Sequence, residues 1–320
     1  MEPADALTHP VALVVGASRG LGLLVARELC ERGHHVVIAA RSAGELESAV
    51  PLVGPSERVT ARVVDIRDRA QVKALVDDVE ATVGPIEVLM TVAGIIQAGP
   101  AESVTLEHFD DAIATMLTGP IALTWAMLPA MRGRGRGRIG TVTSIGGMVS
   151  PPHLLPYATA KFGAVGFSDG LAASLSGTGI TATTIVPGLM RTGSHERATF
   201  TGDPEAEYAW FAPGAALPLL SIDADRAARR MVDATLAGRP MVVLTPLAQV
   251  GIRVRGLMPG ATTRLMGVGN RLLPDAPPGG GETRPVLGRH AAPRLRPAPR
   301  RVVEALTTLG RRAARRNNQR

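Results

Sequence analysis

Continuous apolar segments, separated by segments with helical periodicity, constrain this chain more than any other feature of its sequence. A strand that is apolar on both faces must be covered on both faces, and helices between successive strands supply that cover. The pattern predicts an α/β fold, with a doubly wound (Rossmann-type), mostly parallel sheet and helices on both of its faces. The predicted strands are 11–16, 35–40, 58–65, 86–94, 138–144, 179–188 and 240–246. The predicted helices are 21–33, 43–50, 69–83, 105–131, 155–176 and 223–237.

The sequence changes character after residue 246. Residues 251–320 hold 15 arginines and three acidic residues, whereas the preceding 250 residues hold 20 basic and 25 acidic residues. Within this basic region, 274–299 is rich in Pro and Gly and predicts a linker, and 301–316 predicts a short basic helix. We therefore expect a single α/β domain over 1–246, followed by a basic C-terminal extension over 247–320.

Composition excludes several classes of protein and site. No run of 18 or more uncharged apolar residues is present, and the first residues lack the basic start and apolar centre of a secretory signal. Cys30 is the only cysteine, so no internal disulfide can form. These features predict a cytoplasmic protein. His108, His153 and His195 show no metal-ligand spacing, so we expect no metal site.

A glycine-rich turn joins the first predicted strand to the first predicted helix. In VVGASRGLG (14–22), Gly16, Gly20 and Gly22 allow a tight turn and let backbone N–H groups approach an anion at the helix N-terminus. Tight turns need glycine for other reasons as well. The position between strand and helix favours binding of a dinucleotide pyrophosphate over that alternative.

The end of the second predicted strand indicates which dinucleotide binds. Sites for NAD commonly place an acidic residue there to bind the ribose 2′-hydroxyl, whereas this chain has Ala40 followed by Arg41. Arg41, together with Arg19 of the glycine turn, would attract a 2′-phosphate. We therefore expect NADP(H) to be preferred, with NAD(H) as the alternative cofactor; the alternative for Arg41 is an ordinary surface arginine.

One of the two tyrosines and one of the two lysines lie together in PYATAK (156–161). Tyr157 and Lys161 are four residues apart on a predicted helix, so they share a face. A cation about 4 Å from a phenol can lower its pKa from about 10 by roughly three units before screening. We therefore expect Tyr157 to exchange a proton near neutral pH, as a general acid or base does. A chance pairing on the helix is the alternative.

Ser144 ends the strand predicted over 138–144, thirteen residues before Tyr157. Ligands of doubly wound sheets bind beyond the carboxyl ends of the strands. The Ser144 hydroxyl is therefore expected to bond a substrate carbonyl beside the phenol, although a serine at a strand end can also be an ordinary turn residue.

The segment 11–245 resembles the short-chain dehydrogenase/reductase family. The resemblance rests on GASRGLG, Asp65, the Ala-Gly pair at 93–94, Ser144, YATAK and VPGLMRT (186–192). It implies that 1–246 is a dinucleotide-binding catalytic domain and that the protein forms homo-oligomers. It implies the catalytic residues Ser144, Tyr157 and Lys161. It implies a cofactor site made of Gly16, Ser18, Arg19, Gly20, Leu21, Arg41, Asp65, Ile66, Ala93, Gly94, Tyr157, Lys161, Pro187, Gly188 and Thr192.

The chain departs from the family pattern in two places. Thr91 and Val92 stand where the family has two asparagines before Ala-Gly. Met116 stands where the family has a fourth catalytic residue, an asparagine that holds a water molecule next to the lysine. A thioether is a weak acceptor and no donor. The departure puts proton delivery in question, for which Thr115 or Thr118 are alternatives, and leaves cofactor binding unaffected.

The resulting prediction is an NADPH-dependent oxidoreductase that transfers a hydride between nicotinamide and a carbonyl or secondary alcohol. Apolar residues in 145–156 and 189–220 favour a lipophilic, small-molecule substrate. One alternative is a cofactor-binding regulatory protein with reduced catalysis. Another is a protein that binds an acidic partner or nucleic acid through the basic tail; nucleic acid is disfavoured, because RGRGRGR (132–138) is an ordinary basic loop. The alternation of Leu, Met and Val with Arg over 250–273 leaves a membrane surface open as a partner.

Overall fold

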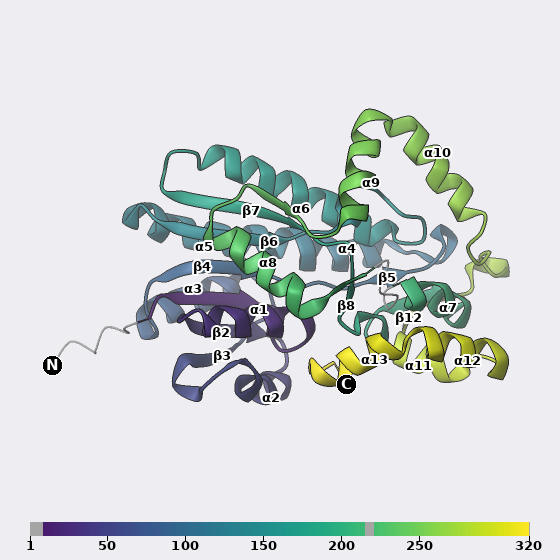
Figure 1. Ribbon diagram of the computed structural model, residues 1–320, viewed down its shortest axis with the longest axis horizontal. Helices are drawn as coiled ribbons and strands as arrows, with labels where there is room; N and C mark the ends of the chain where they lie inside the picture. The colour runs from purple at the N-terminus through teal and green to yellow at the C-terminus, as the bar shows by residue number, and fades with distance from the viewer. Residues whose placement is uncertain (1–8, 215–220, 320) are drawn as a thin grey trace.

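A central sheet of seven parallel strands organises the chain (Figure 1). The structure is a computed structural model, and it describes residues 9–214 and 221–319. The strand order β11-β7-β6-β4-β1-β2-β3 reverses direction between β1 and β4. The prediction of a doubly wound parallel sheet is therefore confirmed. The strands are β1 (Val11–Val15), β2 (His35–Ala40), β3 (Val59–Val63), β4 (Ile86–Thr91), β6 (Gly137–Val142), β7 (Ile180–Val186) and β11 (Met241–Val243).

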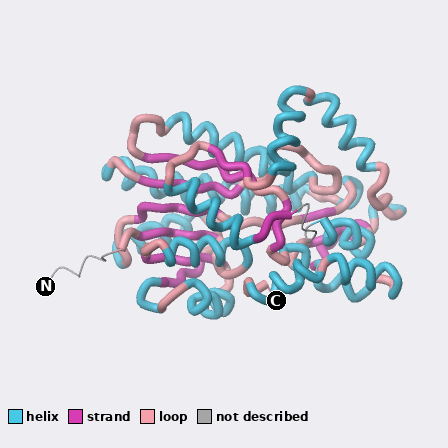
Figure 2. Tube along the Cα trace, viewed as in Figure 1, coloured by secondary structure: helices cyan, strands magenta, loops and turns pink. Residues whose placement is uncertain are grey.

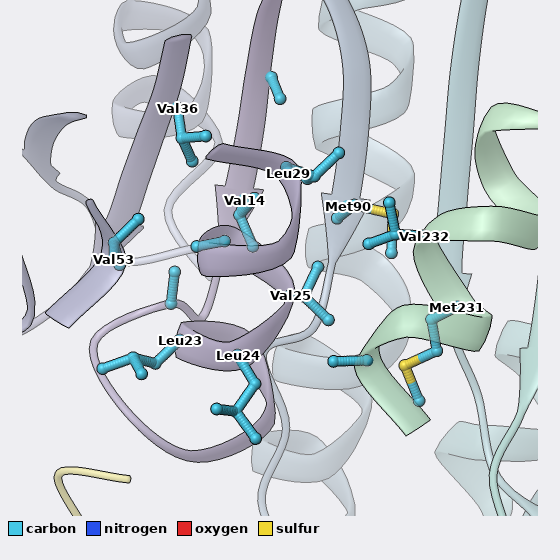
Figure 3. Packing of buried hydrophobic residues seen from close by; sticks show 14 of the residues in the cluster. Val14, Leu23, Leu24, Val25, Leu29, Val36, Val53, Met90, Met231 and Val232 are labelled. Carbon is cyan, nitrogen blue, oxygen red and sulfur yellow. The ribbon is translucent and has the colours of Figure 1, made fainter. Parts of the chain in front are cut away.

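Helices cover both faces of this sheet (Figure 2). One face carries α1 (Gly20–Glu31), α2 (Ala43–Val53) and α8 (Ala224–Leu236). The other carries α3 (Arg69–Thr82), α5 (Gly119–Arg134) and α6 (Leu155–Ser174). Successive residues of a strand point to opposite faces, so Val14 packs against the first group and Leu13 against the second. Figure 3 shows the first layer, where Val25 of α1 and Val232 of α8 lie against the sheet beside Met90.

The long helix predicted over 105–131 is interrupted. It consists of α4 (Leu106–Ile113), a π-helical turn (Ala114–Thr118) and α5. Pro120, at the start of α5, lacks the N–H that would continue the regular hydrogen bonding of the preceding turns. By length and composition Leu106–Arg134 could cross a membrane, but half of its most apolar window is buried in the protein. We interpret it as a core helix of the sheet layer.

A second, three-stranded sheet lies beyond the carboxyl ends of the central strands. Its order is β12-β9-β5, formed by Glu282–Leu287, Thr199–Gly202 and Gln97–Ala98. The linker predicted over 274–299 is therefore wrong for 282–287, which pair antiparallel with β9. Pro285 is tolerated because β12 is an edge strand, where the missing N–H breaks no ladder.

The remaining C-terminal residues form helices. After β11 come α9 (Pro246–Leu257) and α10 (Pro259–Asn270), and after β12 come α11 (Gly288–Ala291), α12 (Pro297–Leu306) and α13 (Thr308–Arg316). The basic helix predicted over 301–316 corresponds to parts of α12 and α13. Val303 and Ala291 pack in one buried cluster with Phe200 and with α7 (Pro204–Gly214). The boundary predicted at residue 246 stays a prediction.

Candidate active site

One cavity of about 930 Å³ lies at the carboxyl ends of the central strands. Loops that follow β1, β2, β3, β4, β6 and β7 supply its walls, as the strand order of a doubly wound sheet requires. Every residue predicted for the site lines this cavity except Gly20. The structure thus brings the predicted set together, while the role of each residue stays a prediction.

The side chains of Ser144 and Tyr157 are neighbours in this cavity, close enough for the Ser144 hydroxyl to lower the pKa of the phenol. Ser144 follows β6, and its Oγ accepts a hydrogen bond of 3.0 Å from the backbone N–H of Gly146. The bond with Gly146 holds the Ser144 side chain in one orientation. Tyr157 lies in the first turn of α6, whose start is set by Pro156. The two hydroxyls therefore line the same part of the cavity.

Lys161 lies one turn further along α6 and is only 4 % exposed. Its Nζ donates a hydrogen bond of 2.7 Å to the carbonyl of Val142 and lies 5.9 Å from the centroid of the Tyr157 ring. Burial lowers the pKa of Lys161 to about 8. The ammonium is therefore held beside the phenol by the last residue of β6.

The pKa of Tyr157 moves opposite to the sequence prediction. Burial raises the pKa of this phenol, and the hydrogen bond from Ser144 offsets only part of that rise. The predicted lowering by Lys161 is wrong here because it assumed a cation about 4 Å away and left out desolvation. Tyr157 consequently holds its proton at neutral pH, which suits a proton donor.

The glycine turn has the close backbone packing that the pyrophosphate interpretation requires. Gly16 has φ +91°, and a Cβ there would lie 2.4 Å from the backbone nitrogen of Ala93. A Cβ on Gly22 would lie 2.0 Å from the carbonyl oxygen of Gly16. Side chains are thus excluded from the turn, and the N-terminus of α1 opens toward the cavity. The close backbone packing of these residues fits a dinucleotide at the N-terminus of α1.

The C-terminal residues reach this same turn, which the sequence did not predict. The backbone N–H of Gly20 donates a hydrogen bond of 2.7 Å to the carbonyl of Asn317. Asn318 Nδ2 donates to the carbonyl of Ser18 at 2.9 Å, and Gln319 lines the cavity. This contact explains why Gly20 alone among the predicted residues is missing from the cavity wall. Residues 317–319 carry no recognisable motif from which this contact could have been predicted.

A second feature missed from the sequence is the carboxylate of Glu45 beside the glycine turn. It accepts hydrogen bonds from Arg19 Nη1 at 2.5 Å and from Ser18 Oγ at 3.0 Å. Glu45 is the third residue of α2, and its backbone N–H is capped by the Ser42 side chain. The Ser-x-x-Glu spacing of a helix start could have placed this acid near the cavity. The charge of Arg19 is therefore balanced by the carboxylate of Glu45.

Arg41 and Asp65 lie in the cavity wall after β2 and β3. Within the described part of the chain, Arg41 forms no hydrogen bond or ion pair. Hydrogen bonds from Arg67 lower the pKa of Asp65, and the charge of Arg41 contributes to the same shift. Arg41 is thus the cation of this wall that remains open to a ligand.

Met116 stands where the family has its catalytic asparagine, and Thr115 is the residue before it. Met116 is 1 % exposed and packs with Ala112 and Ala160 against Tyr157. Thr115 instead lines the cavity, and its buried hydroxyl has no hydrogen-bond partner in residues 9–214 and 221–319. Thr115 was one of the two alternatives that the sequence left open for proton delivery. Its hydroxyl lies in the cavity lining and is available for a hydrogen bond there.

The far wall of the cavity is apolar. It is fixed in part by Glu207, which accepts hydrogen bonds from Trp210 Nε1 at 2.7 Å and bonds His153 Nδ1 at 2.8 Å. The predicted substrate segment continues through 215–220, which lies outside the described residues. Among those described, no three His, Cys, Asp or Glu side chains gather as metal ligands would. The apolar wall consists of Ile95, Ile96, Ile145, Pro151, Leu154, Leu189, Met190, Trp210 and Phe211.

Comparison with known proteins agrees with this geometry. A protein designated ketoacyl reductase 1 of the granaticin polyketide synthase in Streptomyces violaceoruber is 36% identical over 191 residues, which cover 59% of this chain and 70% of that protein. The 3-oxoacyl-acyl-carrier-protein reductase of Escherichia coli is 31% identical over 182 residues, covering 57% and 74%.

Solved structures lead to the same family. A short-chain dehydrogenase from Streptomyces avermitilis superposes with a TM-score of 0.72 at 26% identity, covering 83% of this chain and 99% of that one. An actinorhodin polyketide ketoreductase variant with NADPH superposes with a TM-score of 0.65 at 28% identity, covering 76% and 97%. Residues 10–201 match the family described as short chain dehydrogenase. The chain therefore belongs to the short-chain dehydrogenase family, and it is an NAD(P)-binding oxidoreductase that acts on carbonyl or CH–OH groups.

Proposed function

We propose that this protein is an NADPH-dependent reductase that reduces the ketone of a lipophilic, acyl-type substrate. The observation that carries the proposal is the position of the Ser144 and Tyr157 hydroxyls side by side in a cavity with an apolar far wall. The names of its relatives support the substrate class, because several are ketoacyl reductases. The solved ketoreductase with NADPH supports the cofactor.

The chain's own residues perform the proton chemistry. A substrate carbonyl oxygen between Ser144 and Tyr157 would accept a hydrogen bond from each hydroxyl, which fixes the carbonyl and polarises it. Tyr157 then donates its phenolic proton to the oxygen as the carbon receives a hydride. The raised pKa of Tyr157 keeps that proton in place until the substrate is reduced. Lys161 stabilises the phenolate that remains.

The bound nicotinamide dinucleotide supplies the hydride. Gly16, Ser18 and Leu21 would hold the pyrophosphate at the N-terminus of α1, and Asp65 with Ile66 would flank the adenine. Ala93 and Gly94 would lie along the middle of the cofactor. Pro187, Gly188 and Thr192, which follow β7, would hold the nicotinamide end beside Tyr157.

Arg41 is the residue that favours NADPH over NADH. It lies in the cavity wall directly after β2, whose last residue is Ala40 and not an acidic residue. Arg19 is neutralised by Glu45 and so contributes less than its charge suggested. The preference therefore depends on Arg41.

A panel of ketones tests this proposal. Purified protein is mixed with NADPH and with β-ketoacyl thioesters, aliphatic ketones or cyclic ketones, and loss of nicotinamide absorbance is followed. Turnover of the apolar ketones by the parent protein, and its loss in Tyr157→Phe, is the expected result. Binding of NADPH with no turnover of any ketone or alcohol would overturn it.

The runner-up is a cofactor-binding regulatory protein with reduced catalysis. Met116 in the place of the asparagine and the contact of Asn317 with Gly20 favour this alternative. The same panel separates the two functions. Binding of nucleic acid or an acidic partner by the tail, homo-oligomer formation and a cytoplasmic location stay predictions.

A further inference from the structure

Helices α9 and α10 form a hairpin that projects from the body of the protein (Figures 1 and 2). They join at Met258 and Pro259, at the top of the view in Figure 1. The hairpin takes no part in the catalytic cavity, because the described lining of that cavity contains no residue from 246–273. The proposed function therefore leaves it without a role.

Most large apolar residues of this hairpin are exposed to solvent and do not pack on the body. In α9, Leu247, Val250, Val254 and Leu257 recur at intervals of three and four residues, which places them on one face. All four are exposed, Leu257 to 84 %. The buried side of the same helix is marked by Ala248. A helix that packs on its own core buries its apolar stripe, whereas α9 exposes it.

Helix α10 repeats the arrangement. Leu265 and Val268 are three residues apart and exposed, and Leu272, just beyond the end of the helix, is exposed to 85 %. Thr262, one turn before Leu265, is buried. Met258, between the two helices, is exposed as well, so exposed apolar residues occur on both helices and on the turn that joins them. A connected apolar surface of this kind marks a site of association.

The charges of the hairpin are all positive. Residues 246–273 contain Arg253, Arg255, Arg264 and Arg271 and no acidic residue. None of these four arginines forms an ion pair within the described parts of the chain. Guanidinium groups beside an apolar stripe match the chemistry of a phospholipid surface, where phosphates lie directly above the acyl chains.

We infer that the α9–α10 hairpin docks on the surface of an anionic phospholipid bilayer. Each helix has 12 residues and is therefore about 18 Å long. That length is well short of the roughly 30 Å hydrocarbon core, so the hairpin lies in the interface and does not span it. The apolar stripes enter the boundary between headgroups and acyl chains, and the long arginine side chains reach the phosphates.

Vesicle co-sedimentation of the full-length protein tests this inference. One set of vesicles contains phosphatidylcholine alone, and the other contains phosphatidylcholine mixed with phosphatidylglycerol. The expected result is binding to the mixed vesicles that weakens as salt is added, with much weaker binding to phosphatidylcholine alone.

Two variants separate the apolar and the electrostatic contributions. Leu257→Ser combined with Leu272→Ser should lower the partition coefficient about tenfold or more for each leucine. Arg264→Gln combined with Arg271→Gln should lower it about fivefold for each arginine and reduce its dependence on salt. The matched control is Leu106→Ser on α4, because Leu106 is 78 % exposed and lies outside the hairpin. The control should bind vesicles as the parent does.

Reductase activity without vesicles and the thermal midpoint show that each variant is folded, since none of these residues belongs to the catalytic cavity. Absence of binding to the mixed vesicles at low salt, or equal binding by the Leu257→Ser/Leu272→Ser variant, overturns the inference. Light scattering identifies one further outcome. A parent dimer that becomes a monomer in the leucine variant, without vesicle binding by either, assigns the surface to a second copy of this chain and also overturns it.

Discussion

The backbone N–H of Gly20 donates a hydrogen bond of 2.7 Å to the carbonyl of Asn317, which joins the glycine turn to the far end of the chain. Asn318 adds bonds from its side chain to the carbonyls of Ser18 and Glu45. The first N–H groups of a helix are the ones that bind phosphate. The C-terminal segment therefore uses a donor that a pyrophosphate would also use.

Deleting residues 317–320 should tighten NADPH binding. The deletion frees the N–H of Gly20, and one competing hydrogen bond corresponds to about fivefold in the dissociation constant. Fluorescence titration with NADPH measures the change, and deletion of Arg320 alone is the control. Weaker binding after the deletion would show that Gln319 holds the cofactor instead of competing with it.

Arg41→Ala and Glu45→Gln should shift cofactor preference in opposite directions. Loss of Arg41 removes a cation open to the 2′-phosphate and should weaken NADPH about tenfold while leaving NADH nearly unchanged. Glu45→Gln removes the carboxylate that neutralises Arg19 and should strengthen NADPH relative to NADH. Dissociation constants for both cofactors measure this. Arg69→Ala, an exposed position on α3, is the control. Equal NADPH and NADH constants in the parent protein would contradict the assignment of Arg41.

The reaction should lose efficiency above pH 8. Burial lowers the pKa of Lys161 to about 8, whereas it raises the pKa of Tyr157. As the pH rises through about 8, Lys161 loses the charge that stabilises the phenolate, while Tyr157 still holds its proton. The value of kcat/KM for ketone reduction should therefore fall on the alkaline side. A profile that stays flat well above pH 8 would contradict this role of Lys161.

The same shift predicts the pH dependence of stability. Since the folded protein disfavours protonated Lys161, the unfolded chain binds more protons between pH 8 and the ordinary lysine value of 10.5. The contribution of Lys161 to the free energy of unfolding therefore rises with pH over this window. Lys161→Met should lack that rise, which urea unfolding on either side of pH 8 can measure.

Thr115→Val should separate stability from activity. The buried Thr115 hydroxyl has no partner among the described residues, so its removal should leave stability unchanged or raise it by up to about 1 kcal/mol. Turnover should nevertheless fall if this hydroxyl bonds cofactor or substrate. Thr124→Val is the control, because its hydroxyl bonds the carbonyl of Pro120 at 2.9 Å and its loss should cost stability without affecting turnover directly. A Thr115→Val protein with parental turnover would exclude Thr115 from the site.

The sheet and the location of the cavity could be predicted because local patterns encode them. Buried strands such as Val11–Val15 appear as unbroken apolar runs, and parallel topology places the residues that follow them at one edge. The cluster formed by Ser144, Tyr157 and Lys161 follows from that topology and from helical spacing alone.

The remaining features depend on contacts between distant residues. Residues 282–287 form a strand because β9 is available as a partner, and Pro/Gly composition gives no sign of that pairing. The contact of Asn317 with Gly20 joins residues nearly three hundred positions apart. The direction of the Tyr157 pKa shift depends on how completely its neighbours exclude water, which a spacing between two residues does not contain.

Turnover of an apolar ketone by Tyr157→Phe is the measurement that tests the central claim most directly. The phenylalanine ring keeps the packing of Tyr157 and removes only the hydroxyl that lies beside Ser144. We expect ketone-dependent NADPH oxidation to fall about a hundredfold or more, while the NADPH dissociation constant stays close to that of the parent. Parental turnover in Tyr157→Phe would contradict the account, because the proton would then reach the carbonyl from another group.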